Sequence, residues 1–134
     1  LITTEEQMKY DENKVDLSLL PVEALEAIAK VFEFGAKKYG AFNWRADGEN
    51  TEWRRSFSSL QRHLYAWSEC EDTDPDSGLD HLSHAASQLM IMICHAKNHP
   101  EMDNRYKGDK NENRGNSKRT KTKIHTKDIY YSQQ

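Results

Sequence analysis

Long apolar runs, a signal peptide and cysteine pairs are all missing from this chain of 134 residues, and each absence excludes a class of proteins. A membrane-spanning helix needs about 20 consecutive apolar residues, and no run approaches that length. The start of the chain has no signal-peptide pattern, so we expect a cytoplasmic protein that makes no membrane contact. Cys70 and Cys94 form no CxxC pair, which excludes a disulfide framework and a zinc module of the usual spacing.

The motifs that mark the common nucleotide-binding and hydrolytic folds are also missing. There is no Walker phosphate loop, no GxGxxG fingerprint and no GxSxG elbow, which removes P-loop NTPases, Rossmann enzymes and α/β hydrolases from consideration. No stretch alternates apolar and polar residues for long, and β-branched residues are sparse, so strands are not expected. The sequence therefore predicts an all-α fold.

The charge is divided unevenly along the chain. Residues 1–104 carry 10 Lys and Arg against 19 Asp and Glu, a formal charge of −9, whereas residues 105–134 carry 9 against 3, a formal charge of +6. Residues 1–104 are expected to form one acidic domain. The tail 105–134 has few apolar residues and no period, so we expect it to be disordered. Its charge permits weak contact with nucleic-acid phosphates, although a solvated tail without a partner has the same composition.

Three segments have the apolar spacing of helices. The first spans 21–40 and is opened by a proline and closed by a glycine, the second spans 52–69 and the third 79–97, and short helices near 41–50 also fit. Three short helices bury little apolar surface, so we expect a homo-oligomer, a dimer or a tetramer, to complete the bundle. The expected core faces comprise Leu25, Ile28, Ala29, Phe32, Ala36 and Tyr39 in the first helix, Trp53, Phe57, Leu60, Leu64 and Trp67 in the second, and Leu82, Ala85, Ala86, Leu89, Met90, Ile93 and Ala96 in the third.

The stretch ECEDTDPDSGLDHLSHAASQ, residues 69–88, places carboxylates and imidazoles close together. Glu71 and Asp74 are three residues apart, as are His81 and His84, and residues at that spacing share one face of a helix. Paired carboxylates hold Mg²⁺ or Mn²⁺, and imidazole ligands widen the choice toward transition metals. The alternative is a solvated acidic turn followed by hydrogen-bonded structural histidines, because Asp, Pro, Ser and Gly all favour turns.

Glu23 and Glu26 form a second, weaker candidate metal pair at the same spacing. They also fit a surface stripe in which Glu26 pairs with Lys30 and Glu33 pairs with Lys37, since residues four apart on a helix are neighbours. The surface stripe is the preferred interpretation.

A further candidate site is the stretch GAKKYGAFNW, residues 35–44. Lys37 and Lys38 carry the charge needed to neutralise phosphates, and an aromatic ring such as that of Trp44 can stack on a base. The same residues also fit a helix end whose aromatic rings pack in the core. Earlier in the chain, KYDENK at residues 9–14 is expected to be an extended or loop segment and is a candidate lid over the site.

Several of these blocks together resemble a known family. The order KYDENKVDLSLLPVEALEAIAKVFEFGAKKYGAFNW, then RHLYAW, then EDTDPDSGLDHLSHA is similar to the small dATP/dGTP diphosphohydrolases of phages and bacteria, which are MazG-like, all-α nucleotide pyrophosphohydrolases and include the MazZ type. The resemblance covers roughly residues 9–95. It implies hydrolysis of a purine deoxynucleoside triphosphate to the monophosphate and pyrophosphate, with Mg²⁺ or Mn²⁺ as cofactor. For a phage protein, it implies the host cytoplasm.

The resemblance also implies roles for individual residues. Metal ligands would be Glu71 and Asp74, while His81 and His84 would bind metal or phosphate and His63 would orient water or phosphate. The triphosphate would be held by Lys14, Lys37, Lys38 and Arg62, and the base or sugar by Asn43 and Trp44. Two positions depart from the family pattern, because Asn13 precedes Lys14 and Cys70 precedes Glu71 where the family has glycine.

Two other classes of function stay open. An HD-type phosphohydrolase would use His63, His81, His84 and Asp80, although that family has the order His-Asp where this chain has Asp80-His81. A non-enzymatic helical protein that binds nucleic acid or another partner would rely on the basic tail, and its core would not need clustered histidines and carboxylates.

Overall fold

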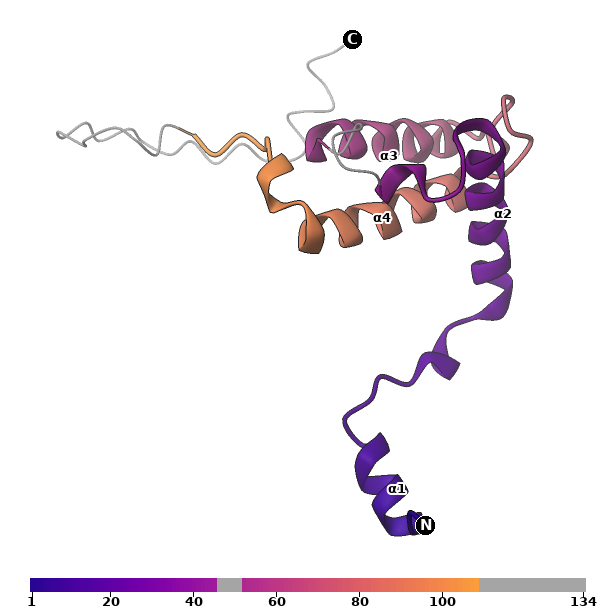
Figure 1. The fold of residues 1–134 in the computed structure, drawn as a ribbon. Coiled ribbons are helices and arrows are strands. Elements are labelled where there is room, and N and C mark those ends of the chain that lie inside the picture. Colours follow the sequence, from indigo (N-terminus) through magenta and orange to yellow (C-terminus); the bar gives the residue numbers. More distant parts are fainter. Residues whose placement is uncertain (46–51, 109–134) are drawn as a thin grey trace, which may run out of the picture.

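The computed structural model describes residues 1–45 and 52–108, and within these residues it contains helices and no strand, as the sequence predicted (Figure 1). The basic tail was expected to be disordered, but from residue 109 onward it lies outside the described part of the chain. The elements in order are α1 (Thr4–Asp11), η1 (Leu17–Leu19), α2 (Val22–Tyr39), η2 (Asn43–Arg45), α3 (Trp53–Ser68), α4 (His81–Asn98) and η3 (Pro100–Met102).

Helices α3 and α4 lie side by side and run in opposite directions, because the short connection between them turns the chain back (Figure 1). Helix α2 stands across one end of this pair and contacts α4. Helix α1 lies beyond the first turn of α2, apart from the α3–α4 pair. The expected lid, residues 9–14, belongs to this outlying part. None of the described helices is apolar and long enough to span a membrane.

The ends of the three main helices follow local sequence signals. Pro21 is the N-cap residue of α2, and Gly40 ends that helix with a φ of 93°, a backbone conformation that favours glycine. Glu52 and Glu69 cap the two ends of α3, and Asp80 caps α4. The predicted ranges for these helices are therefore confirmed to within two residues.

Helix α1 was not predicted, and the expectation that residues 9–14 are entirely loop is wrong for the first three of them. The Thr3 hydroxyl accepts a hydrogen bond from the Glu6 backbone N–H, and the Glu6 carboxylate accepts one from the Thr3 backbone N–H. This reciprocal pair is a capping box, which satisfies two backbone donors at the helix start. Its T-x-x-E signature is present at residues 3–6 and could have located the helix.

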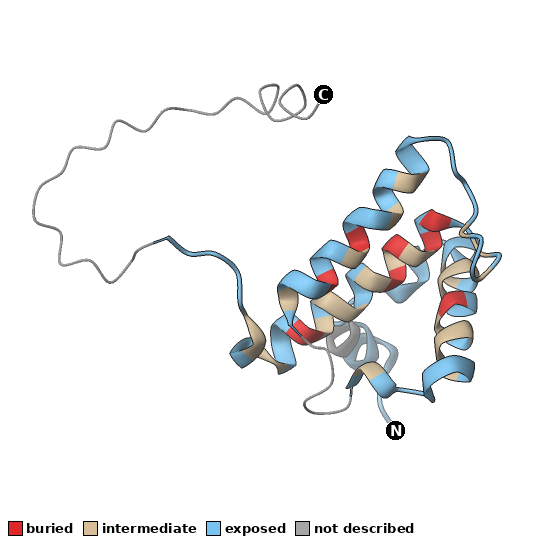
Figure 2. Cartoon of the chain, turned by 90° about the horizontal axis from the view of Figure 1, so that it is seen from above, coloured by how far each residue is buried: buried red, intermediate tan, exposed pale blue. Residues whose placement is uncertain are grey.

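The predicted core face of α4 is wrong in most of its positions. Ala85 is buried, but the helix otherwise turns His81, Ser83, Ser87 and His95 inward (Figure 2). The imidazoles of His81 and His95 each have a hydrogen-bond acceptor, the half-exposed Glu71 carboxylate and the Trp44 carbonyl oxygen, and these bonds offset the cost of burying the rings. The predicted core residues Leu82, Leu89, Met90 and Ile93 are instead 36–58% exposed.

The apolar core within the described chain is small. Its fully buried apolar residues are Val31, Leu60 and Ala85. The predicted seam of α3 is covered at Leu60, whereas Phe57, Leu64 and Trp67 remain 38–50% exposed; α4 is the main packing partner of α3 within the described chain. Both helices of the pair therefore present large apolar side chains to solvent in the single chain.

Candidate functional site

The loop that carries the candidate carboxylates begins at Cys70, which has a φ of 66°. The Cys70 N–H donates to the Trp67 carbonyl oxygen at 3.0 Å, and the Glu71 N–H donates to the Ala66 carbonyl oxygen at 3.0 Å. This pair of bonds ends α3 with a left-handed residue, the arrangement in which glycine is preferred. The left-handed backbone at this position therefore explains why the family pattern has glycine here. Asn13, the other departure, adopts no positive φ.

Replacing Cys70 by glycine should stabilise the fold by about 0.5–1 kcal/mol. A side chain with a Cβ costs about 1–2 kcal/mol in the left-handed region, and the greater freedom of glycine in the unfolded chain offsets part of the gain. Chemical denaturation of the purified protein measures the difference. Cys70→Ala is the matched control, because it removes the thiol and keeps the Cβ. Equal stability of the glycine and alanine variants would contradict the explanation.

The acidic stretch that follows is an ordered turn built around Asp74. The Asp74 N–H donates to the Leu79 carbonyl oxygen and the Gly78 N–H donates to the Asp74 carbonyl oxygen, both at 2.8 Å. The Asp74 side chain accepts the Asp76 N–H through Oδ1 at 2.8 Å. The turn interpretation is thus right for the backbone. The Asp74 carboxylate, however, is only 17% exposed, and its second oxygen points toward His63 and His84.

Asp80 fixes the start of α4 and thereby the direction of the two histidines. Its Oδ1 accepts the Ser83 N–H and its Oδ2 accepts the Ser83 hydroxyl, both at 2.7 Å. Burial acts to raise the pKa of Asp80, but these hydrogen bonds outweigh it and the pKa is lowered. Because both oxygens already serve the helix cap, Asp80 is poorly placed as the metal ligand that an HD-type site would need.

Three groups form a continuous hydrogen-bonded chain across the loop and both helices. His81 Nε2 lies 2.8 Å from Glu71 Oε1, and His81 Nδ1 lies 2.9 Å from His63 Nδ1. The Glu71 carboxylate can only accept, so His81 carries a proton on Nε2. A neutral His81 then accepts at Nδ1, and His63 donates from its own Nδ1. One proton therefore lies between the two Nδ1 atoms.

His84 and Asp74 complete the cluster. Asp74 Oδ2 lies 3.9 Å from His63 Nδ1 and 3.7 Å from His84 Nε2. The rings of His63 and His84 stack with their centroids 4.6 Å apart and their planes 4° from parallel. The five residues that the sequence singled out as catalytic are therefore brought together by the structure.

The pKa values of three groups in this cluster are shifted by their surroundings. Burial lowers the pKa of His63, and the neighbouring His84 lowers it further. Burial also lowers the pKa of His84, although Asp74 acts in the opposite direction. For Asp74, burial acts to raise the pKa, but the Asp76 N–H and the histidines together lower it. These directions favour uncharged His63 and His84 side chains and an ionised Asp74 carboxylate near neutral pH.

The donor atoms fit a divalent cation. One ligand atom each from His63, Asp74 and His81 lies within 4.8 Å of the others, and all three residues are at least partly buried. Two imidazoles and one carboxylate suit Mn²⁺ or another transition metal better than Mg²⁺, which prefers oxygen. Glu71 holds the far nitrogen of His81, which is how carboxylates orient metal-binding histidines in many proteins. His63 thus joins the ligand candidates, whereas Glu71 and His84, which the resemblance also named as ligands, do not belong to this group of three, and Glu71 contacts it at His81.

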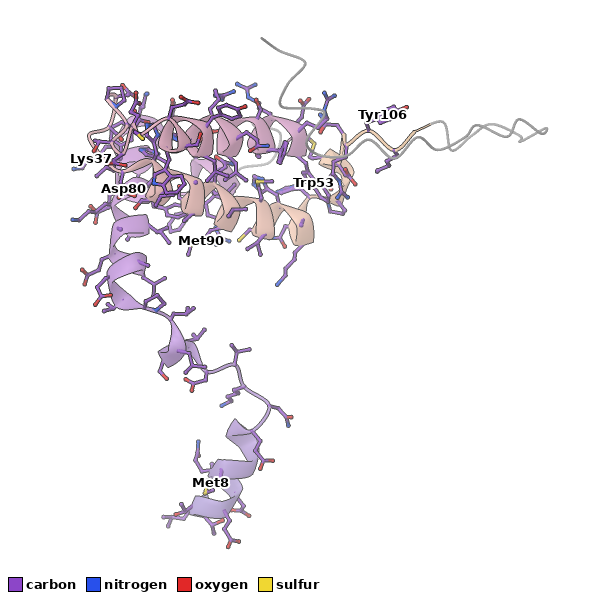
Figure 3. All side chains as sticks on the ribbon, turned by 180° about the vertical axis from the view of Figure 1, so that it is seen from behind. Met8, Lys37, Trp53, Asp80, Met90 and Tyr106 are labelled. Carbon is purple, nitrogen blue, oxygen red and sulfur yellow. The ribbon has the colours of Figure 1, made fainter. Side chains whose placement is uncertain are left out.

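Some of the predicted phosphate-binding residues lie at the same end of the molecule. Lys38, in the last turn of α2, places Nζ 3.5 Å from Asp76 Oδ2 in the acidic loop. Figure 3 shows Lys37 at this end of the α3–α4 pair, near Asp80. Arg62 is exposed on α3, directly before His63, and its guanidinium donates a hydrogen bond to the Ser58 hydroxyl at 3.0 Å.

Other predicted residues are not brought to the cluster. Lys14 lies in the segment between α1 and η1, and Glu23 and Glu26 are exposed in the first turns of α2, at the opposite end of that helix from Lys38. Asn43 and Trp44 belong to η2. The Trp44 ring packs against Phe32 and His95, each with centroids 6.0 Å away. This packing agrees with the core alternative for Trp44 alone, because Tyr39 and Phe42 are 64% and 70% exposed.

Two residues in the cluster were missed from the sequence. Ser77 Oγ lies 2.6 Å from His84 Nε2, and the Phe34 ring meets the edge of His84 at 6.5 Å. Phe34 lies one helical turn before Lys38, a spacing that could have drawn attention to it. Ser77 belongs to the turn residues and carried no distinguishing pattern.

Comparison with known proteins supplies independent information. A family profile described as dATP/dGTP diphosphohydrolase, N-terminal, matches residues 4–105. The chain is also similar to a protein named dATP/dGTP diphosphohydrolase from Salmonella phage PMBT28, with 34% identity over 98 residues. This match covers 73% of the chain and 32% of the phage protein, so the chain spans about a third of that relative's length. No solved structure matches the chain.

Proposed function

Because the chain belongs to the dATP/dGTP diphosphohydrolase family, we propose that it hydrolyses a purine deoxynucleoside triphosphate to the monophosphate and pyrophosphate with the help of a divalent metal. The observation that supports this proposal is the grouping of His63, Asp74 and His81, whose ligand atoms lie within 4.8 Å of one another. The phage origin of the relative favours the host cytoplasm as the place of the reaction.

Each group in the cluster has a task in this reaction. A divalent ion, when bound, polarises a phosphoryl oxygen or water and neutralises charge on the leaving pyrophosphate. His63, Asp74 and His81 would hold that ion, and Glu71 would keep His81 in the required orientation. His84, whose pKa is lowered chiefly by burial, is neutral near pH 7 and can accept the proton of an attacking water.

Charge around the cluster also has to favour an anionic substrate. Residues 1–104 carry a formal charge of −9, which repels a triphosphate over long range. Lys37 and Lys38 at the end of α2, together with Arg62 on α3, supply local positive charge beside the cluster. Guanidinium and ammonium groups bind phosphate oxygens by charge-assisted hydrogen bonds, so these three side chains are the proposed triphosphate contacts.

A product assay tests the proposed reaction. The purified full chain is incubated with each of the four dNTPs and Mg²⁺ or Mn²⁺, and the nucleotides are resolved by chromatography. We expect dGMP or dAMP together with pyrophosphate. Release of nucleoside and tripolyphosphate would replace the proposal by an HD-type reaction. Absence of turnover with either metal, combined with salt-sensitive DNA binding that is lost on deleting residues 105–134, would replace it by a nucleic-acid-binding function.

Glu71→Gln should lower the rate of metal-dependent hydrolysis by about 10–100-fold, the usual effect of losing a carboxylate that orients a metal-binding histidine. Glutamine can still accept the His81 N–H, but it lacks the charge that makes the imidazole a stronger ligand. Steady-state kinetics over a range of Mn²⁺ concentrations measures the effect. Glu69→Gln, at the exposed C-cap of α3, makes the same chemical change two residues earlier and should keep full activity.

A further inference from the structure

The histidine cluster offers groups for the metal and the phosphates of the proposed substrate, and none of them is an aromatic platform for its base. The family resemblance gives the base or sugar to Asn43 and Trp44. The Trp44 ring, however, packs against Phe32 and His95, each with centroids 6.0 Å away, and the Arg45 guanidinium lies 4.6 Å over it. These neighbours occupy surface on which a base could otherwise stack. A base therefore needs a more exposed aromatic ring beside the cluster.

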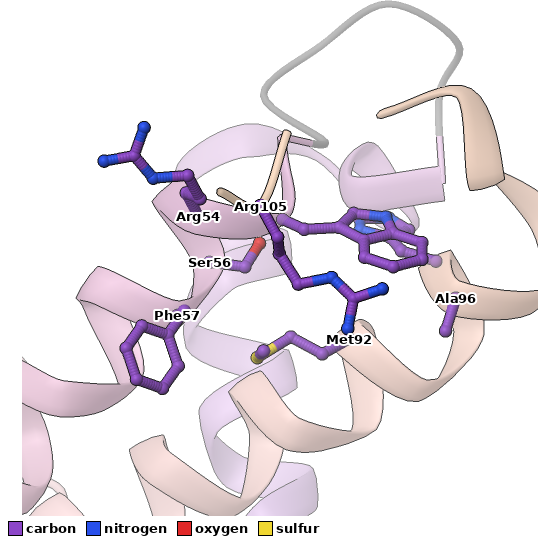
Figure 4. Close-up of a pocket in the computed structure, with 8 residues that line it drawn as sticks. Arg54, Ser56, Phe57, Met92, Ala96 and Arg105 are labelled. Carbon is purple, nitrogen blue, oxygen red and sulfur yellow. The ribbon is translucent and has the colours of Figure 1, made fainter. Parts of the chain in front are cut away.

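A cavity of about 260 Å³ between α3 and α4 lies too far from the cluster to serve this purpose. It is mainly apolar and is lined by residues from the start of α3, including Trp53 and Phe57, and from the last turns of α4, including Met92 and His95 (Figure 4). His84 and His95 are separated by about 16 Å along α4 at the rise of a helix. A base whose phosphates lie at the cluster must meet a surface nearer to His84.

Tyr39 has an exposed ring at the end of α2 that meets the acidic loop. It is the last residue of that helix and is 64% exposed. The Lys38 ammonium lies 5.4 Å from the centroid of the Tyr39 ring and 3.5 Å from Asp76 Oδ2 in the loop. The Asp76 N–H in turn donates to Oδ1 of Asp74, whose other oxygen faces the histidines. A short series of contacts thus joins Tyr39 to the proposed metal ligand Asp74.

Phe34 provides a second route from Lys38 to the cluster. Its ring lies 5.8 Å from the Lys38 ammonium and meets the edge of the His84 ring with centroids 6.5 Å apart. Phe34 and Lys38 are four residues apart on α2, so they share one face of the helix. Both routes place the Lys38 ammonium beside the cluster and the Tyr39 ring next to that ammonium.

The Tyr39 ring is free to receive a base. A group packed against a ring lies about 3.5–4.0 Å from its carbon atoms, and the Lys38 ammonium is farther than that from the centroid, at 5.4 Å. An ammonium and an exposed aromatic ring side by side match the phosphate and the base of a single nucleotide. Tyr39 therefore has both the exposure and the neighbours that base binding requires.

Two other exposed aromatic rings fit less well. Phe42 is 70% exposed, but the contact that its ring makes is with the Arg45 guanidinium, 5.9 Å away, and not with the acidic loop. Trp67 is 47% exposed and lies one turn after His63. It belongs to α3, however, whereas the two lysines proposed to hold the phosphates belong to the same helix as Tyr39.

We propose that Tyr39 is the residue on which the base of the substrate stacks, and that this contact favours purines over pyrimidines. The inference rests on the proposed hydrolysis, which supplies the deoxynucleoside triphosphate. Every base has an apolar face that can stack on an aromatic ring. A purine has two fused rings, so it overlaps more of the Tyr39 ring and gains more dispersion contacts than a pyrimidine does. Tyr39 thus contributes to affinity for any dNTP and more to affinity for dGTP and dATP.

Calorimetric titration of the purified full chain in Mn²⁺ tests this role. The probe is a dGTP analogue in which a methylene group replaces the oxygen between the α- and β-phosphorus atoms, so that it cannot be cleaved there. Tyr39→Leu should weaken its binding about tenfold or more, and Tyr39→Phe should stay within about threefold of the unchanged protein because it keeps the ring. The preference for this analogue over the corresponding dCTP analogue should fall at least about threefold in Tyr39→Leu.

Tripolyphosphate, which has no base, separates stacking from a loss of structure. Its binding should change less than about twofold in Tyr39→Leu, whereas a damaged site would lose both ligands. Phe42→Leu and Trp67→Leu are the matched controls, since each removes another exposed ring, and both should bind the dGTP analogue within about threefold of the unchanged protein.

The role of Tyr39 is overturned if Tyr39→Leu binds the analogue as tightly as the unchanged protein, if Tyr39→Phe loses as much affinity as Tyr39→Leu, or if Trp67→Leu has the larger effect. Equal loss of tripolyphosphate and analogue in Tyr39→Leu also overturns it. Failure of the proposed hydrolysis gives a different result, because the unchanged protein would then release no pyrophosphate from any dNTP and would bind neither ligand.

Discussion

Asp74→Asn should reduce metal-dependent dNTP hydrolysis by about 100- to 10,000-fold, which corresponds to the several kcal/mol of charge stabilisation that a bound metal supplies. The Asp74 carboxylate is the only acidic side chain among the three groups that converge within the described chain. Removing its charge leaves only imidazole ligands, which hold Mn²⁺ weakly and Mg²⁺ hardly at all.

The asparagine substitution is informative because it spares the turn. The Asn side-chain oxygen can still accept the Asp76 N–H that Asp74 Oδ1 accepts, so the loop should keep its shape. Asp72→Asn makes the same change on an exposed neighbour and should keep activity near that of the unchanged protein. Mn²⁺ affinity, measured by calorimetry, should fall together with the rate. Full activity of Asp74→Asn in a folded protein would remove Asp74 from the ligand set.

Ile93→Glu should convert a self-associated protein into a monomer, weakening association by about 100-fold or more. We propose that a second copy of the chain covers the exposed apolar side chains of α3 and α4. Six of these side chains are 36–58% exposed: Leu82, Leu89, Met90 and Ile93 on α4, and Phe57 and Leu64 on α3. A carboxylate buried in such an interface would lose its hydration without gaining a partner.

Light scattering coupled to size-exclusion chromatography measures the mass of each variant. Asn98→Glu is the matched control, since it adds the same charge at the exposed last residue of α4, on a different side of the helix from Ile93. It should leave the mass unchanged. A monomeric unchanged protein, or equal masses for Ile93→Glu and the oligomeric parent, would show that no second copy covers this surface.

Local signals in the sequence were sufficient to place the main helices. Pro21, Gly40 and Asp80 each act through their own backbone or a hydrogen bond to a residue three positions away, so the neighbouring sequence contains the necessary information. The T-x-x-E capping box before α1 is of the same kind, and that helix could have been predicted with it. Capping interactions are short in range, which is why they can be identified without a structure.

The orientation of α4 could not be predicted in the same way. Periodicity favours burial of its leucine and isoleucine face, and the structure buries the histidine face instead. The acceptors that make this possible are the Glu71 carboxylate and the Trp44 carbonyl, the second of which lies 51 positions from His95 in the chain. A buried imidazole is tolerated only where such an acceptor exists, so the choice between the two faces depends on tertiary contacts.

The candidate site shows the same division between local and tertiary information. The grouping of Glu71, Asp74, His81 and His84 followed from their closeness in the sequence, and these side chains lie close together in the structure. The hydrogen bond between His63 and His81 depends on the antiparallel packing of α3 and α4, which spacing within one helix cannot show. For Lys14 and Trp44, proposed from the resemblance, the structure places neither side chain beside the cluster, and their roles stay predictions.

The acidic turn between α3 and α4 has a consequence for how the site assembles during folding. The five side chains that the sequence singled out in the cluster lie from His63 to His84, so every contact among these five closes a short loop. Contacts of low sequence separation cost little loop entropy and form early. The cluster should therefore appear as soon as this one helical hairpin does, before the earlier part of the chain docks. The geometry of the cluster should therefore depend on the stability of that hairpin, which includes the left-handed turn at Cys70. It should depend less on the stability of the whole molecule.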